Sequence, residues 1–183
     1  MKSKKYIKYI LYIFVLITVL VSFLISCQSS LVNTKVVEYN KKLNEYRDYY
    51  LKIQNLTINY SEKITEIADK INQSDDISEI CDYYEMALNL FKNYYDEFAK
   101  LKMPSIANNF ANYNAVFIQL QISRISNLID YYNGDNPEYT LEKDSELLQK
   151  ITDANLKTIQ ELKNINNYFN QEAEKLGLEK PFK

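Results

Sequence analysis

The sequence predicts an all-α protein, namely an up-down-up-down antiparallel four-helix bundle with longer first and fourth helices, after an N-terminal signal/membrane helix. Three observations support this fold class. The chain has 183 residues, of which 46% are hydrophobic, and this is enough to build the core of one domain. Two Gly and three Pro are too few for the turns of a β-sandwich, a barrel or a doubly wound α/β fold. From residue 32 onward, apolar residues recur at helical spacing in four successive stretches.

The first bundle helix is expected over residues 32–72. Its apolar pattern steps by four and three residues, as in a coiled coil, and runs through Val32, Val36, Tyr39, Leu43, Tyr46, Tyr50, Ile53, Thr57, Tyr60, Ile64, Ile67 and Ile71. Thr57 is the one residue in this pattern that is neither apolar nor aromatic. The pattern stops at residues 72–76, where Ser74, Asp75 and Asp76 are suitable N-caps for the next helix.

The second helix is expected over 76–102 and the third over 105–133, with a break at Lys102-Met103-Pro104 between them. Proline disfavours helix in the residue before it and suits the first turn of a helix. The third stretch carries two apolar stripes one residue apart, one through Phe117 and the other through Ile118. A stripe this wide can contact two neighbouring helices, so the third helix should be the most buried of the four.

The fourth helix is expected over 139–176, after the break at Asn133-Gly134-Asp135-Asn136-Pro137, and residues 178–183 form a short tail. Four amphipathic helices with short connections favour antiparallel neighbours. The unequal lengths would make the first and fourth helices overshoot the other two by roughly 10–20 Å. We therefore expect a two-helix stalk, in which 32–43 pack near 165–176 and bury less apolar surface than the rest of the bundle.

The first 26 residues have the features of a secretory signal peptide. Lys2, Lys4, Lys5 and Lys8 form a positive n-region, and an almost unbroken apolar run follows from Tyr9 to Phe23. The run closes with Leu24-Ile25-Ser26-Cys27, which resembles the lipobox of bacterial lipoproteins, and polar residues follow it. The resemblance implies cleavage between Ser26 and Cys27 and a diacylglyceryl group on the Cys27 thiol. It also implies acylation of the new amino group, as by palmitate.

The predicted domain organisation follows from this resemblance. It consists of a signal peptide over 1–26, a lipidated linker over 27–31 and the bundle over 32–177. Two or three acyl chains are sufficient for stable membrane anchoring. An alternative stays open, in which residues 9–26 form an uncleaved membrane-spanning helix and Cys27 is a bystander. The apolar stretch of 18 residues is at the short end for spanning. In either case the rest of the chain should lie outside the cytoplasmic membrane, on its outer face or at an outer membrane.

The body of the chain also resembles uncharacterised helical lipoproteins of AT-rich bacteria. The similarity rests on the Met103-Pro104 break, the Tyr-Tyr-Asn-Gly-Asp turn over residues 131–135 and the closing Leu-Gly-Leu over 176–178. That group implies no known activity. The joint abundance of Lys, Asn, Ile and Tyr is typical of an AT-rich genome. Codon usage therefore accounts for most of the tyrosine, including the doublets at 49–50, 83–84, 94–95 and 131–132. In each doublet one ring should lie near the surface, where Tyr contacts peptides or glycans well.

The charge of the chain argues against anionic partners. Removal of residues 1–26 takes away four of the 22 basic residues and none of the 24 acidic ones, which leaves 18 against 24 and a formal charge of −6. Nucleic acids and anionic bilayer faces both favour clustered Lys and Arg, so neither is expected as a partner of the mature part.

Catalytic and metal chemistry are not expected. The chain has no His, which is the commonest general base and a common metal ligand, so triads and Glu-x-x-His metal sites are excluded. Acidic residues fall mostly on faces opposite the apolar stripes, as is typical of solvated helix surfaces. With Cys27 lipidated, Cys81 has no disulfide partner, and we expect it to be a small buried hydrophobe. No cofactor is expected beyond the lipid on Cys27.

The candidate binding residues are polar side chains within the apolar stripes, namely Thr57, Arg124, Asn127, Asn155, Thr158 and Glu172. Height arithmetic places Thr57 and Asn155 at similar depth, which predicts a polar layer or a small polar pocket. Such a layer can specify helix register, as single polar core residues do in coiled coils. Arg124 is expected near the height of Asp82 and Glu85, so it should form a structural ion pair there or bind the carboxylate of a ligand.

These features favour a membrane-anchored, non-enzymatic envelope lipoprotein whose bundle binds another protein or a ligand. An alternative function is an extracytoplasmic sensor or accessory domain of a signalling or transport system, although the sequence shows no second apolar span and no signalling domain. A hydrolase that uses paired carboxylates is a third interpretation, but no pair of acidic residues stands out. The sequence does not identify the partner.

Overall fold

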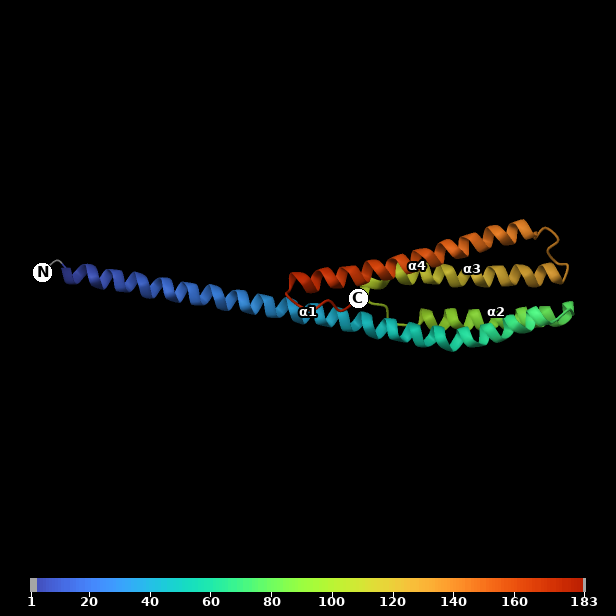
Figure 1. The fold of residues 1–183 in the computed structure, drawn as a ribbon, viewed down its shortest axis with the longest axis horizontal. Helices are drawn as coiled ribbons and strands as arrows, with labels where there is room; N and C mark the ends of the chain where they lie inside the picture. Colours follow the sequence, from blue (N-terminus) through green and yellow to red (C-terminus); the bar gives the residue numbers. More distant parts are fainter. Residues whose placement is uncertain (1–2, 183) are drawn as a thin grey trace.

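The structure is a computed structural model that describes residues 3–182, with side chains from Asn33 to Phe182 except Leu141. Four helices pack against one another, and no strand is present in the described residues (Figure 1). They are α1 (Ser3–Gln73), α2 (Ile77–Ala99), α3 (Asn108–Tyr132) and α4 (Leu141–Lys175), with a 3-10 turn, η1 (Ser105–Ala107), directly before α3. The predictions of a signal peptide, a lipobox and a linker concern residues before Asn33, whose side chains lie outside the described residues.

The ends of the helices follow the local capping chemistry. Asp76 caps α2, since its Oδ1 accepts a hydrogen bond of 2.8 Å from the backbone N–H of Ser78. Gly134 and Gly177, with φ values of +78° and +69°, follow the C-caps of α3 and α4 in the left-handed conformation that glycine adopts without strain. Helix α2 ends at Ala99 rather than at the expected residue 102. The chain has to leave the α region before Pro104, so the helix stops earlier than the apolar pattern does.

Neighbouring helices along the chain pack in pairs. Helix α2 packs between α1 and α3, and α3 packs against both α2 and α4, as the double apolar stripe of the third stretch predicts. Figure 1 shows the N-terminal part of α1 extending alone beyond the other helices. The α1–α2 turn and the α3–α4 loop lie together at the opposite end of the molecule, which we call the far end (Figure 1).

Two of the largest fully buried side chains, Tyr46 and Phe169, lie where the beginning of the packed section of α1 meets the end of α4. Phe169 and Ala173 are 0% exposed, and Tyr46 is 2% exposed. The Phe169 ring lies 5.5 Å from that of Tyr46 and 6.0 Å from that of Tyr39, whose hydroxyl donates a hydrogen bond of 3.2 Å to the Phe169 carbonyl. The expected pairing of 32–43 with 165–176 is therefore present, since Tyr39 contacts Phe169, but the expectation that this section buries less than the rest of the bundle is wrong. Aromatic side chains fill this contact, so it belongs to the core.

The C-terminal tail folds back over this contact. Leu178 and Gly177 donate backbone hydrogen bonds to the carbonyls of Ala173 and Glu174, the two bonds of a Schellman motif. The Asn170 amide then donates to the carbonyl of Phe182 at 2.9 Å and accepts from its N–H at 3.1 Å. These bonds direct the Phe182 ring against Tyr46 and Phe169, so the tail closes one side of the α1–α4 contact.

Helix α3 provides the centre of the remaining packing. Ile118 is 0% exposed, whereas Phe117, which we expected at the centre, is only half-buried. Of the two stripes on this helix, the one through Ile118 and Ile125 therefore faces the core more directly. Among the residues described in full, no helix is long and apolar enough to cross a membrane.

Candidate functional site

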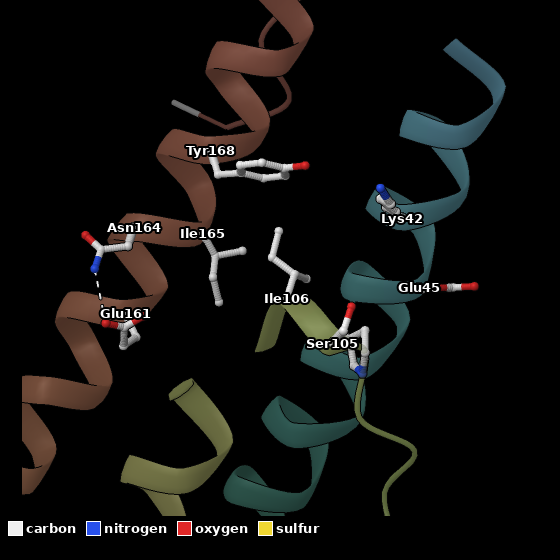
Figure 2. Close-up of a pocket in the computed structure, with 9 residues that line it drawn as sticks. Lys42, Glu45, Ser105, Ile106, Glu161, Asn164, Ile165 and Tyr168 are labelled. Carbon is white, nitrogen blue, oxygen red and sulfur yellow. Dashed lines mark hydrogen bonds between the residues drawn. The ribbon is translucent and has the colours of Figure 1, made fainter. Parts of the chain in front are cut away.

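A groove of about 400 Å³ lies between α1 and α4 beside η1 (Figure 2). Its floor is apolar, because Ile106 of η1 and Ile165 of α4 point into the space between these elements (Figure 2). Its rim is polar and consists mainly of Lys42, Glu45, Ser105, Glu161, Asn164 and Tyr168. The Lys102–Pro104 connection positions Ile106, so the helix break seen in the sequence has a direct role in shaping this groove.

The charges around the groove are mixed and partly paired. The Lys42 ammonium lies 2.8 Å from a carboxylate oxygen of Glu38, and this hydrogen bond and charge raise the pKa of Lys42. On the opposite rim, which α4 forms, Asn164 donates a hydrogen bond of 3.2 Å to Glu161. Tyr168 is 40% exposed and extends its ring from α4 toward α1 (Figure 2). The groove thus offers one exposed aromatic ring and alternating charges above an apolar floor.

A second hollow of about 250 Å³ continues the groove along α1 and α4 toward the end of α4. It shares Lys42 and Tyr168 with the first and extends to Lys35, Glu172 and Leu176. Together the two hollows form an open channel along one side of the α1–α4 contact. Such a channel suits an extended polar chain better than a compact small molecule, since small-molecule sites are mostly apolar and enclosed.

The grooves contain no arrangement that indicates catalysis. Activated nucleophiles need an adjacent base, and general acid–base pairs need perturbed carboxyl or imidazole groups at hydrogen-bond distance. In the described part of the chain, no three His, Cys, Asp or Glu residues lie close enough together to hold a metal ion.

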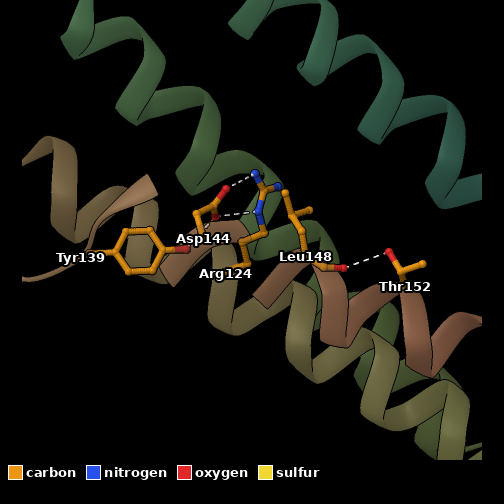
Figure 3. Close-up of polar contacts among 5 residues, drawn as sticks. All are labelled: Arg124, Tyr139, Asp144, Leu148 and Thr152. Carbon is orange, nitrogen blue, oxygen red and sulfur yellow. Dashed lines mark hydrogen bonds and ion pairs between the residues drawn. The ribbon is translucent and has the colours of Figure 1, made fainter. Parts of the chain in front are cut away.

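A second polar site links α3 to the first turn of α4 (Figure 3). The Arg124 guanidinium makes a bidentate pair with Asp144, with Nε 2.8 Å from Oδ1 and Nη2 3.0 Å from Oδ2. The buried Tyr139 also donates a hydrogen bond of 2.6 Å to Oδ1. Burial alone would raise the pKa of Asp144, but the hydrogen bonds from Arg124 and Tyr139 and the charge of Arg124 outweigh it, so this pKa is lowered. The saturated carboxylate and the paired guanidinium make this a structural ion pair.

The expected partners of Arg124 were wrong. Asp82 and Glu85 are exposed on α2, whereas Arg124 pairs with Asp144 on α4. The position of a residue along the helix axis gives the level of its side chain in the bundle. It does not give the direction in which that side chain points. The loop before α4 brings Tyr139 and Asp144 to the side of α3 that carries Arg124, so the pair forms across α3 and α4.

The expected polar layer between Thr57 and Asn155 does not form in the core. Both side chains are exposed, and the Thr57 hydroxyl instead makes a hydrogen bond of 3.0 Å with the Tyr94 hydroxyl on α2. Leu56 is buried in place of Thr57, and the shift is local, since Tyr60, Ile64 and Ile67 of the predicted pattern are again buried or half-buried. Asn127 is half-buried, and Glu172 is half-buried and ion-paired with Lys175 at 2.6 Å.

The buried polar residues are Asn114 and Thr158, with 9% and 8% exposure. They directly follow Tyr113 and Lys157, which contact each other across α3 and α4, so both lie at the same level of the molecule. The Thr158 hydroxyl donates to the Ala154 carbonyl of its own helix, and the Asn114 Nδ2 has no hydrogen-bond partner among the described residues. Sequence reasoning found Thr158 but missed Asn114. The four-residue spacing of Phe110, Asn114 and Ile118 is the signal that could have identified it.

Cys81 is half-buried rather than fully buried. Burial raises the pKa of its thiol, and the neighbouring Asp82 and Glu85 raise it further. A thiol in this environment stays protonated at neutral pH, so it lacks the thiolate that nucleophilic or redox chemistry requires.

Comparisons of this chain with models of protein families, with curated proteins and with solved structures find no match. Its function therefore has to be inferred from its own residues.

Proposed function

We propose that this chain is a membrane-anchored envelope lipoprotein and that its helical part is a non-enzymatic module that binds another envelope protein. In this proposal the helices form an up-down-up-down antiparallel bundle, and Cys27 carries the lipid. The single observation that carries the proposal is the order of a basic n-region, an apolar run and Leu24-Ile25-Ser26-Cys27. A lipid anchor of two or three acyl chains would hold the chain at a membrane without a spanning helix.

The helical segment between Cys27 and the core fits this arrangement. The helix runs from Ser3 to Gln73, and its first buried described residue is Tyr39. Tyr39 is twelve positions after Cys27, which corresponds to about 18 Å of helix. A single helical segment of this length would keep the core and its grooves clear of the lipid headgroups while it keeps the module close to the membrane.

The shape of the grooves supports binding of a protein. The channel along α1 and α4 is open, has alternating charges and contains the exposed ring of Tyr168. Aromatic residues surrounded by a polar rim are typical of protein–protein contacts. The protonated thiol of Cys81 and the saturated carboxylate of Asp144 offer no reactive group for an enzyme.

Metabolic labelling with a fatty-acid analogue tests the anchor. We expect the wild-type chain to take up the label and Cys27→Ala to lose it and to accumulate as a longer precursor. Cys81→Ala is the matched control, since it removes the other thiol and should leave labelling unchanged. A wild-type chain that takes no label, or a Cys27→Ala chain that retains it, would contradict the lipoprotein proposal. Crosslinking in intact cells would then identify the protein that the module contacts.

A further inference from the structure

Four tyrosines form a connected group at the far end of the molecule. The ring of Tyr84 on α2 stacks on that of Tyr132 at 5.9 Å, Tyr132 contacts Tyr131 at 5.5 Å, and Tyr131 contacts Tyr139 at 6.5 Å. Tyr131 and Tyr132 are 49% and 37% exposed although they end a helix that is otherwise well packed. We call Tyr84, Tyr131, Tyr132 and Tyr139 the far-end tyrosine cluster. Its two exposed rings offer an aromatic surface that the rest of the chain does not cover.

A groove of about 410 Å³ adjoins this cluster at Tyr139. It runs between the end of α3 and the beginning of α4, and Leu147 contributes an apolar side chain to it. Its polar groups come from Ser123, Asn127, Asn136, Glu138, Lys143, Glu146 and Lys150. The groove is therefore mixed in charge, with Glu138 and Glu146 beside Lys143 and Lys150, and it meets the aromatic cluster at Tyr139.

The charge of the chain is strongly polarised toward this surface. Residues 69–86 and 130–146, which build the far end, contain twelve Asp and Glu against two Lys, a formal charge of −10. The remaining residues from 27 onward contain twelve acidic and sixteen basic residues, a formal charge of +4. Asp144 is the one carboxylate of the twelve that the described part of the chain pairs with a basic side chain, Arg124. The other eleven lie in the two segments that meet at this end of the molecule, and no ion pair joins them to a basic side chain of the described residues.

We propose that the far-end tyrosine cluster is a docking surface for an arginine-rich segment of a partner polypeptide. Arginine suits both features at once, because its planar guanidinium stacks on tyrosine rings and its donors bind carboxylates in a bidentate manner. A lysine-rich segment would satisfy the charge but would use the rings less well, since its ammonium is a compact and strongly hydrated point charge. This inference deepens the proposed protein-binding role and does not depend on the lipid anchor.

Fluorescence anisotropy of labelled octa-arginine and octa-lysine peptides, added to the full chain in a non-ionic detergent, tests the proposal. We expect octa-arginine to bind more tightly than octa-lysine and to lose affinity as salt is added. Tyr131→Ala and Tyr132→Ala should each weaken octa-arginine binding about two- to fivefold, which is the change expected for an exposed cation–π contact. Tyr168→Ala tests the α1–α4 groove in the same way, since Tyr168 is similarly exposed there. Leu156→Ala is the control, since Leu156 is exposed on α4 and lines none of the three grooves.

Each result supports or overturns the proposal. Equal affinity for both peptides, with no effect of Tyr131→Ala or Tyr132→Ala, would show attraction by charge alone and would overturn it. Absence of octa-arginine binding at low salt would overturn it as well. A larger loss with Tyr168→Ala would move the docking surface to the other groove. Circular dichroism of each variant checks that the helices stay intact. Loss of fatty-acid labelling at Cys27 would contradict the anchor without affecting these outcomes, so the two proposals fail independently.

Discussion

Truncation of Phe169 to alanine removes the most enclosed large side chain at the contact between α1 and α4. Phe169 is 0% exposed and has aromatic neighbours on α1 and in the C-terminal tail. It lies 5.5 Å from the ring of Tyr46, 6.0 Å from that of Tyr39 and 6.2 Å from that of Phe182 in the tail. A cavity at this point would therefore weaken α1, α4 and the C-terminal tail together.

The expected cost follows from burial and from these ring contacts. Phe→Ala in a packed core costs roughly 3–5 kcal/mol, and favourable aromatic pairs add about 0.5–1.5 kcal/mol each beyond area burial. Because the neighbours of Phe169 come from rigid helices that cannot collapse far, we expect a loss at the upper end of the first range. Phe117→Ala is the matched comparison. Phe117 is half-buried, so its truncation should cost only roughly 1–2 kcal/mol.

Urea unfolding of residues 29–183, followed by circular dichroism at the helix minimum, measures both losses. The segment should fold alone as a nearly all-helical unit, since the described core begins at Tyr39. Linear extrapolation then gives the free energy of unfolding for each variant. If Phe169→Ala costs less than Phe117→Ala, the α1–α4 contact is not a tightly packed part of the core and the reasoning is wrong. Substantial strand content in the spectrum would contradict the fold itself.

Two further predictions concern the Arg124–Asp144 pair and local opening. Asp144→Asn should cost roughly 1.5–3 kcal/mol, the usual value of hydrogen bonds to a charged group, whereas Asp135→Asn in the exposed loop should cost little. The lowered pKa of Asp144 means that the unfolded chain binds its proton first as the pH falls. The ionised Asp144 carboxylate therefore stabilises the folded state above the ordinary aspartate pKa, and this stabilisation is lost as the pH falls through the lowered pKa. The difference in free energy of unfolding between wild type and Asp144→Asn should thus disappear in acid. Hydrogen exchange should be slower at 39–46 and 165–173 than at 57–66, where most side chains are exposed. Faster exchange at 39–46 and 165–173 would show that these two segments form a loosely packed stalk after all.

The elements of the fold were predictable because each rests on local chemistry. Apolar residues at helical spacing identify the four helices, and the turn residues between them set the boundaries within a few positions. Asp76 and Gly134 do in the structure what their residue types indicate, one as an N-cap and the other in the left-handed conformation after α3. The exception is the end of α2. The apolar pattern continues to Leu101, but the helix ends at Ala99, before the constraint that Pro104 places on the backbone.

The choice between adjacent stripe positions was not predictable, because it depends on which helix lies opposite. On α1 the pattern alone favours Thr57, yet Leu56 is buried and Thr57 is exposed. The first packed turns of α1 face Phe169 of α4, and the later turns face α2. A repeat that treats α1 as having one partner throughout therefore misassigns the residue where the partner changes, whereas Tyr60, Ile64, Ile67 and Ile71 further on lie at the predicted positions and are buried or half-buried. The same limit explains why Ile118 rather than Phe117 is fully buried on α3.

The site residues depend even more on direction than the core residues do. An apolar side chain on a wide stripe finds some neighbour over a large range of helix rotation, whereas a guanidinium needs a carboxylate at about 3 Å and in its own plane. Arg124 and Asp144 are twenty residues apart, and they meet because the length of the loop before α4 places Asp144 at the level of Arg124. Residue spacing within one helix carries no information on that length. Tyr131 and Tyr132 depart from the expectation that one ring of a doublet lies near the surface, since both are exposed and no further turn of α3 follows to cover them. The sequence therefore indicates one exposed ring, while the second exposed ring and the nearness of two acidic connections become visible only when these connections are brought to the same end of the molecule.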